Sequence, residues 1–219
     1  MNSRIRTVLA VFAFAGLMAM AGTARASYSG VAFCNVSTAV AGLTPTVSTL
    51  AAGEATGTEC ATFSASSIDF SAETSLGYNL GGFLNGLGAA SGITYLNGFS
   101  ASSALNNSLF DFTGAANFTT GQSFSVTHDD GTNMYVNGNL VLGAPNPTAP
   151  VSTPFTYSGP SGNFNFEFIY TECCGGDADY ITSLVPVTTG TVPEPETLAM
   201  VGSGLLGLCE VVRRRYTNK

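Results

Sequence analysis

Residues 162–170 read GNFNFEFIY, a run in which every second position from 164 to 170 is aromatic. Successive side chains of a β-strand point to opposite faces, so this alternation predicts a strand that is buried on one side only. The aromatic face consists of Phe164, Phe166, Phe168 and Tyr170, and the other face of Asn163, Asn165, Glu167 and Ile169. A half-buried strand of this length favours a protein built on sheets.

Other short runs point the same way. SLFDFTG and QSFSVTH alternate apolar with polar residues, which places Phe124 and Val126 on one face. Asn137-Gly138 stands between two apolar runs, a pattern typical of a tight hairpin. Helical periodicity is scarce, and the 15 Phe and 8 Tyr favour a packed core over disorder. We therefore predict an all-β fold, an antiparallel β-sandwich or jelly roll of about 165 residues.

Three stretches fit this pattern less well. Residues 35–62 are poor in aromatic side chains and are compatible with edge strands or with a long loop closed by a disulfide. The glycine-rich run SLGYNLGGFLNGLGAASG leaves its structure open. The passage from Ala144 to Pro154 contains four prolines, which cannot continue a central strand, so we expect an exposed loop there.

The first 26 residues have the three parts of a secretory signal. Arg4 and Arg6 form a basic start, an apolar run follows, and Ala24 and Ala26 supply the small residues of a cleavage site. This layout predicts an N-terminal signal helix, passage through the Sec translocon, and cleavage by signal peptidase. The mature chain then begins near Ser27.

Residues 191–219 have the layout of a membrane anchor. A cluster of Pro and Glu precedes an apolar stretch from Leu198 to Val212, and Arg213, Arg214 and Arg215 follow it. The stretch is shorter than the roughly 20 apolar residues of a permanent span, and basic residues tend to stay cytoplasmic. We therefore expect a short transmembrane helix that holds an exported precursor in the inner membrane, with residues 27–190 as the ectodomain.

The charge of the ectodomain is one-sided. All seven basic residues lie in the two ends, so segment 27–192 contains no Lys or Arg, while it keeps eleven of the fourteen acidic residues. Nucleic-acid binding depends on Lys and Arg contacts to phosphate, and we therefore expect none. Attachment to an anionic membrane surface is disfavoured for the same reason.

Four cysteines fall in the ectodomain, namely Cys34, Cys60, Cys173 and Cys174. An oxidising compartment favours disulfides, and four cysteines permit three pairings. We favour Cys34 with Cys60, which flank segments of similar composition and would close a loop worth about 3 kcal/mol. Cys173 and Cys174 then form a vicinal disulfide, or else each of the adjacent pair reaches one of the two distant cysteines.

Two acidic groups follow predicted strands. Asp129 and Asp130 lead into Gly131, and the turn ECCGGDADY offers Glu172, Asp177 and Asp179. Oxygen ligands in loops suit calcium, which takes about six to eight of them in irregular geometry. An external cation is a natural partner in a domain without Lys or Arg, although Asp and Gly are also ordinary residues of solvated turns.

Catalysis is disfavoured by the residues at hand. His128 is the single histidine of the chain, and its neighbour Asp129 would point to the opposite face of a strand, unable to orient the imidazole ring. A Gly-x-Ser-x-Gly nucleophile turn is absent from the sequence. We therefore expect a protein that is not an enzyme.

The tail resembles the PEP-CTERM sorting signal of Gram-negative bacteria. Pro193, Glu194 and Pro195 stand in the motif, Thr197-Leu198 follow, and then come the glycine-bearing apolar segment and the arginine cluster. The resemblance implies recognition by an exosortase, a membrane transpeptidase, and release or attachment at the cell surface or outside the cell. Such substrates accompany exopolysaccharide and biofilm systems.

Residues 93–187 resemble protective-antigen-type domains, a β-sandwich family that includes calcium-dependent, flocculin-like lectins. The matching motif is HDDGTNMYVNGNLVL. In those lectins paired aspartates bind calcium, which binds sugar hydroxyls, so the resemblance implies this role for Asp129 and Asp130. The family's second ligand loop corresponds in order to ECCGGDAD, and we infer Asp177 and Asp179 as further ligands from that position.

Two functions follow from these observations. The first is a surface-sorted module that binds extracellular polysaccharide through calcium, with aromatic side chains near the loop stacking on the sugar ring. The second is a structural protein of the biofilm matrix with the same fold and no specific ligand.

Overall fold

The computed structural model describes residues 27–37, 39, 45–72, 77–85, 90–144 and 147–187. They belong to one compact unit, residues 25–188. The signal segment with Ala24 and Ala26, the sorting tail with its prolines and arginines, and both predicted terminal helices lie outside the described residues. Among the described helices, none is long and apolar enough to cross a membrane.

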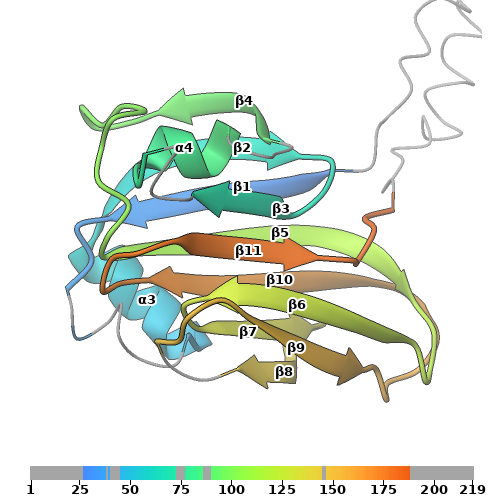
Figure 1. Ribbon diagram of the computed structural model, residues 1–219. Helices are drawn as coiled ribbons and strands as arrows, with labels where there is room; N and C mark the ends of the chain where they lie inside the picture. The colour runs from blue at the N-terminus through green and yellow to red at the C-terminus, as the bar shows by residue number, and fades with distance from the viewer. Residues whose placement is uncertain are drawn as a thin grey trace, which may run out of the picture. The chain divides into compact units, whose positions relative to one another are not determined.

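Two antiparallel sheets make up the domain, which confirms the predicted all-β sandwich. The larger sheet has seven strands in the order β4 (Ala90–Tyr95), β2 (Thr58–Ala65), β1 (Tyr28–Cys34), β5 (Ser108–Phe118), β10 (Gly162–Glu172), β7 (Thr132–Val136) and β8 (Asn139–Ala144). The smaller has four, in the order β3 (Asp69–Ala72), β11 (Ala178–Thr182), β6 (Ser123–Asp129) and β9 (Val151–Thr156). In Figure 1 the smaller sheet lies in front of the larger one, as the second layer of the sandwich.

The aromatic alternation of β10 forms the core between the sheets, as predicted. Phe166, Phe168 and Tyr170 are buried on the side that faces the smaller sheet. Tyr180 of β11 meets them there, with its ring centroid 4.6 Å from that of Tyr170 and 5.9 Å from that of Phe168. Stacked and edge-to-face pairs at such distances add to the stabilisation from buried area.

A second, smaller cluster covers the outer face of β10. Ile169 is fully buried there with Leu109 of β5 and Leu50 of helix α3 (Val47–Thr56). The sequence analysis predicted edge strands or a loop across residues 35–62. The helix was missed because most of its apolar residues are alanines, which give a weak periodic signal. Gly53 permits the close approach, since a Cβ there would lie 3.0 Å from a Leu109 methyl carbon.

Helix α4 (Leu80–Asn85) lies in the glycine-rich run whose structure the sequence left open. Asn79 caps its start, because the Asn79 side-chain oxygen accepts a hydrogen bond from the Gly82 amide at 2.8 Å. Phe83 enters the core, where its ring centroid lies 4.8 Å from that of Phe110. The helix therefore closes one side of the core with very few residues.

Strand β9 corrects the prediction of an exposed loop through Pro154. The strand pairs only with β6, at the edge of the smaller sheet, and Pro154 stands opposite Ser125. An edge strand tolerates proline because the missing N–H would not have joined the ladder. The preceding residues 147–150 do form a loop, as expected.

The predicted hairpin at Asn137-Gly138 is present between β7 and β8. Both residues have positive φ, 48° for Asn137 and 75° for Gly138. This is the geometry that matches a tight turn to the twist of its strands.

The structure pairs Cys34 with Cys60, as we favoured from the sequence, and Cys173 with Cys174, one of the two arrangements left open for the adjacent pair. The first joins β1 to β2, and both of its cysteines are buried in the core. The second lies in the loop between β10 and β11, where Cys174 is exposed. The two bonds thus occupy contrasting environments.

We expect the double substitution Cys34→Ala and Cys60→Ala to lower the free energy of unfolding by about 3 kcal/mol, because the bond closes a long loop in the unfolded chain. Cysteine positions 26 residues apart define that loop. Urea denaturation followed by circular dichroism measures the change. The matched control is Cys173→Ala with Cys174→Ala, which removes a bond between neighbours and should cost much less; equal losses would contradict this account.

Candidate functional site

The ends of several strands meet at one end of the sandwich. Strand β6 ends at Asp129, β10 ends at Glu172, and the loop that leads into β9 passes beside them. They enclose a depression of about 430 Å³, here named the acidic hollow, which is lined by Asp129, Asp130, Pro147, Thr148, Ala149, Pro150, Cys174, Gly175, Gly176 and Asp177. Its size is in the range of small-ligand sites.

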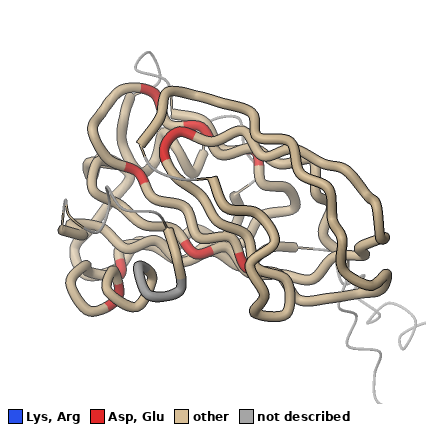
Figure 2. Tube along the Cα trace, turned by 90° about the horizontal axis from the view of Figure 1, so that it is seen from below, with Lys and Arg blue, Asp and Glu red and all other residues tan. Residues whose placement is uncertain are grey.

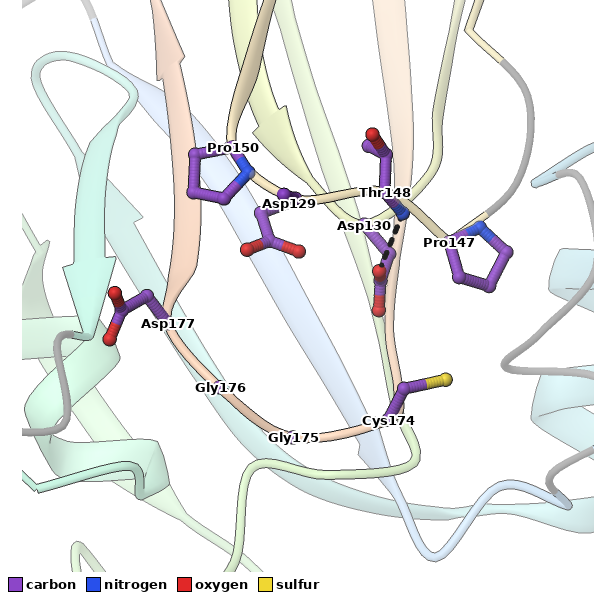
Figure 3. A pocket seen from close by; sticks show the side chains of 10 residues that line it. Asp129, Asp130, Pro147, Thr148, Pro150, Cys174, Gly175, Gly176 and Asp177 are labelled. Carbon is purple, nitrogen blue, oxygen red and sulfur yellow. Dashed lines mark hydrogen bonds between the residues drawn. The ribbon is translucent and has the colours of Figure 1, made fainter.

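Asp129 and Asp130 lie side by side in the acidic hollow, and Figure 3 shows both carboxylates pointing toward the segment 174–177. The peptide bond that joins them is cis. Burial, followed by the charges of Asp130, Asp179 and Asp177, raises the pKa of the Asp129 carboxyl to about 7. Carboxylates crowded in this way repel one another and favour a cation or a proton.

Asp130 is held by two loops. One carboxylate oxygen accepts a hydrogen bond from the Thr148 amide at 3.0 Å, and the other accepts one from the Cys173 amide at 2.8 Å. The side chain is 3% exposed. Two backbone donors fix the orientation of the carboxylate and also tie the loop before β9 to the loop after β10.

His128 supports this arrangement from below and is itself 2% exposed. Its Nδ1 lies 2.5 Å from the Asp130 carbonyl oxygen and its Nε2 lies 2.9 Å from the Thr153 hydroxyl. A carbonyl only accepts, so Nδ1 donates and Nε2 accepts from the hydroxyl. Burial lowers the pKa of the imidazole, which fits this neutral form. Both ring nitrogens are thus engaged in holding backbone and strand.

Glu172 is a buried carboxyl beneath the acidic hollow, 1% exposed, with an oxygen within 4.8 Å of oxygens of Asp129 and Asp130. It pairs with the hydroxyls of Tyr78 and Tyr170. Burial raises its pKa to about 9. A protonated Glu172 can donate to Tyr170, which in turn donates to the Asp129 carbonyl, so the chain of hydrogen bonds is complete.

Of the four predicted metal ligands, only Asp129 and Asp130 belong to a group of described acidic residues whose oxygens lie within 4.8 Å of one another, and the third member of that group is Glu172. Asp129, Asp130 and Asp177 line the acidic hollow, with Asp177 exposed after two glycines. Asp179 does not line it; it lies on β11 directly opposite Asp129 in the strand register. Figure 2 shows acidic residues and no basic ones along the described trace, in keeping with the composition.

Other site residues were missed or misjudged from sequence. Thr148 and Thr153 lie in the proline-rich stretch for which the sequence predicted only an exposed loop. The burial of Glu172 could not be predicted either, because it depends on a tyrosine that is distant in the sequence. The expected aromatic platform is wrong for the described part of the acidic hollow, where Pro147, Pro150 and Cys174 supply the apolar surface instead.

Residues 191–215 match the sequence profile of the PEP-CTERM protein-sorting motif. The chain carries this sorting signal. It confirms the resemblance seen in the tail and marks an exported, membrane-anchored precursor of the kind that an exosortase sorts. No curated protein matches the chain significantly.

The solved structures to which this chain is similar include two PA14 domains. A PA14 sugar-binding domain from an RTX adhesin aligns with a TM-score of 0.51 and 21% identity, over 74% of this chain and 90% of that one. The PA14 domain of the antifreeze protein MpAFP aligns with a TM-score of 0.49 and 22% identity, over 75% and 83%. The first of these likenesses identifies the described sandwich as PA14-like, in agreement with the protective-antigen-type resemblance.

We expect the stability of the PA14-like domain in EDTA to fall as pH rises from 5 to 8. The pKa of the Glu172 carboxyl is about 4.5, its ordinary value, in the unfolded chain, and burial raises it to about 9 in the folded protein. Between these values the folded chain holds the extra proton, so unfolding becomes easier with rising pH, by up to about 1.4 kcal/mol per pH unit. Urea titrations at each pH should show a shallower slope for Glu172→Gln.

The Asp111→Asn variant is the comparison for the pH dependence of stability measured with Glu172→Gln. Burial, then Glu167 and Glu54, raise the pKa of Asp111 to about 7, so this substitution should flatten the slope only below that pH. A Glu172→Gln variant with the slope of the parent protein would contradict a buried, neutral Glu172.

Proposed function

We propose that this protein is a secreted, surface-sorted carbohydrate-binding module whose acidic hollow binds calcium. Asp129 and Asp130 are the central ligands, and the exposed Asp177 on the wall of the hollow would join them by turning its carboxylate inward. The observation that carries the proposal is the Asp129–Asp130 pair, whose carboxylate oxygens lie within 4.8 Å of each other at a solvent-open hollow in a domain that has no Lys or Arg.

Calcium suits this donor set. The ion takes about six to eight oxygens, and carboxylates with backbone carbonyls and water are its usual partners. Asp130 is already oriented by two amide donors, whereas the crowded Asp129 gains most from a cation. Asp179, beside Asp129 in register, adds negative charge to the site without lining it. Once bound, calcium would supply a positive centre for neutral ligands with adjacent hydroxyl groups.

A sugar fits the remaining surface of the acidic hollow. Hydroxyl groups would complete the calcium shell, while Pro147, Pro150 and Cys174 present apolar atoms to a ring face. A PA14-like neighbour named as sugar-binding supports the same use of this fold. The sorting motif places such a module outside the cytoplasm, where it would hold matrix polysaccharide at the cell surface or in a biofilm.

The proposed role is binding and not catalysis. His128 has both ring nitrogens engaged by the Asp130 carbonyl and Thr153, so it has no free nitrogen to activate a nucleophile. The alternative function is that of a structural matrix protein without a specific ligand, and glycan binding distinguishes the two functions.

We expect segment 27–192 to bind calcium in isothermal titration, with an affinity in the roughly millimolar to micromolar range of extracellular and sensor sites. That segment contains both cores and both disulfides of the compact unit. Asp129→Asn and Asp130→Asn should each weaken binding at least about tenfold, because a neutral amide gives the ion less than a carboxylate. Glu59→Gln on β2 is the matched control and should bind like the parent.

Circular dichroism verifies that each variant is folded. Absence of calcium binding at millimolar concentration, or full binding by the double Asp→Asn variant, would rule out this metal site.

We expect the same segment to bind a restricted set of glycans on an array, and to release them when EDTA removes calcium. The ion links the protein carboxylates to the sugar hydroxyls, so metal and sugar should be lost together. The Asp129→Asn variant should fail on the array while Glu59→Gln succeeds. A calcium-binding domain that recognises no glycan would favour the structural matrix protein.

A further inference from the structure

We propose that the Cys173–Cys174 disulfide is a reversible thiol–disulfide exchange site that controls the acidic hollow, its co-reactant being a small dithiol. The effect on ligand binding rests on the proposed calcium function. The covalent chemistry and the loop movement do not, and they are tested separately.

The bond is directly connected to the site. The amide of Cys173 donates the 2.8 Å hydrogen bond that holds one oxygen of Asp130, and Cys174 lines the acidic hollow. Sulfur atoms of both cysteines and an oxygen of Asp130 lie within 4.8 Å of one another. Any change in the backbone of this pair therefore changes how Asp130 is held.

The backbone around the bond depends on it. Cys174 has a φ of 71°, a region that a residue with a side chain seldom occupies, and Gly175 and Gly176 follow with φ of 75° and 121°. A bond between adjacent residues closes a small ring and restricts their torsions. Without it Cys174 is free to return to ordinary backbone angles, and the two glycines offer no resistance.

Exposure makes the reaction selective. Cys174 is exposed, while Cys173 is 4% exposed. Cys34 and Cys60 are 1% and 0% exposed and are covered by the core. A thiolate must reach a sulfur atom to attack it, so a dithiol should open the first bond in the folded protein and leave the second intact.

The proposed reduction takes place in two thiol–disulfide exchange steps. A thiolate of the dithiol attacks Cys174 Sγ, the S–S bond breaks, and Cys173 leaves as a thiolate that takes up a proton. The second thiol of the reagent then attacks the mixed disulfide and releases Cys174. The protein gains two hydrogens and two electrons, and the reagent becomes a cyclic disulfide.

The test treats folded segment 27–192 with dithiothreitol, with iodoacetamide labelling and mass spectrometry of one portion. We expect two labels, on Cys173 and Cys174, and none on Cys34 or Cys60. Hydrogen exchange should become faster in the peptides that contain the Cys173 and Thr148 amides. Unlabelled Cys173 and Cys174, or unchanged exchange after their reduction, would overturn the proposal whether or not the protein binds calcium.

Calcium titration then measures the consequence for the site. Reduction should weaken binding about 10- to 100-fold, the usual cost of losing a group that orients a metal ligand, and reoxidation should restore it. The variant with Cys173→Ser and Cys174→Ser should bind weakly with or without the dithiol, whereas Cys34→Ala with Cys60→Ala should keep the response. Equal affinity in the oxidised and reduced protein overturns the control of binding, while no binding by the oxidised protein refutes the proposed function instead.

Discussion

The stacked contact between Tyr170 and Tyr180 holds the two sheets of the domain together. Their rings stack at 4.6 Å and join the two sheets, because Tyr170 belongs to β10 of the larger sheet and Tyr180 to β11 of the smaller. These strands are consecutive, so the short loop between them has to cross from one sheet to the other beside the end of β6. The same Tyr170 hydroxyl contacts the Asp129 carbonyl. Core packing and site geometry are thus set by one pair of side chains.

A domain without Lys or Arg has to stabilise its carboxyl groups by other means, and two of these are visible near the tyrosine pair. Glu172 is kept neutral by burial and is satisfied by tyrosine hydroxyls. Asp130 is satisfied by two backbone amides, which donate hydrogen bonds to its two carboxylate oxygens. Asp129 has mainly other carboxylates around it, which is the environment that an external cation relieves. The acidic hollow is therefore the place where the proposed cation would supply the positive charge that the domain lacks.

Export gives these features a common setting. The sorting motif marks the chain as an exported one, and outside the cytoplasm free calcium and disulfides are both available. The proposed calcium site would need an abundant ion, and an exposed disulfide persists only where reductants are scarce. The Cys173–Cys174 loop and the loop containing Thr148 both end on Asp130, so a single carboxylate would report on metal, ligand and redox state.

The sequence by itself determined what depends on neighbouring residues: the alternation of β10, the turn at Asn137-Gly138, the sorting tail, and the paired aspartates. Such features are local, because strand period and turn angles follow from adjacent side chains and backbone sterics. Only the tertiary structure decided helix α3, the position of β9 at a sheet edge, and the setting of Asp130. The two amides that hold Asp130 lie 18 and 43 residues away along the chain, and their approach results from the order of strands in two packed sheets, which no local pattern encodes.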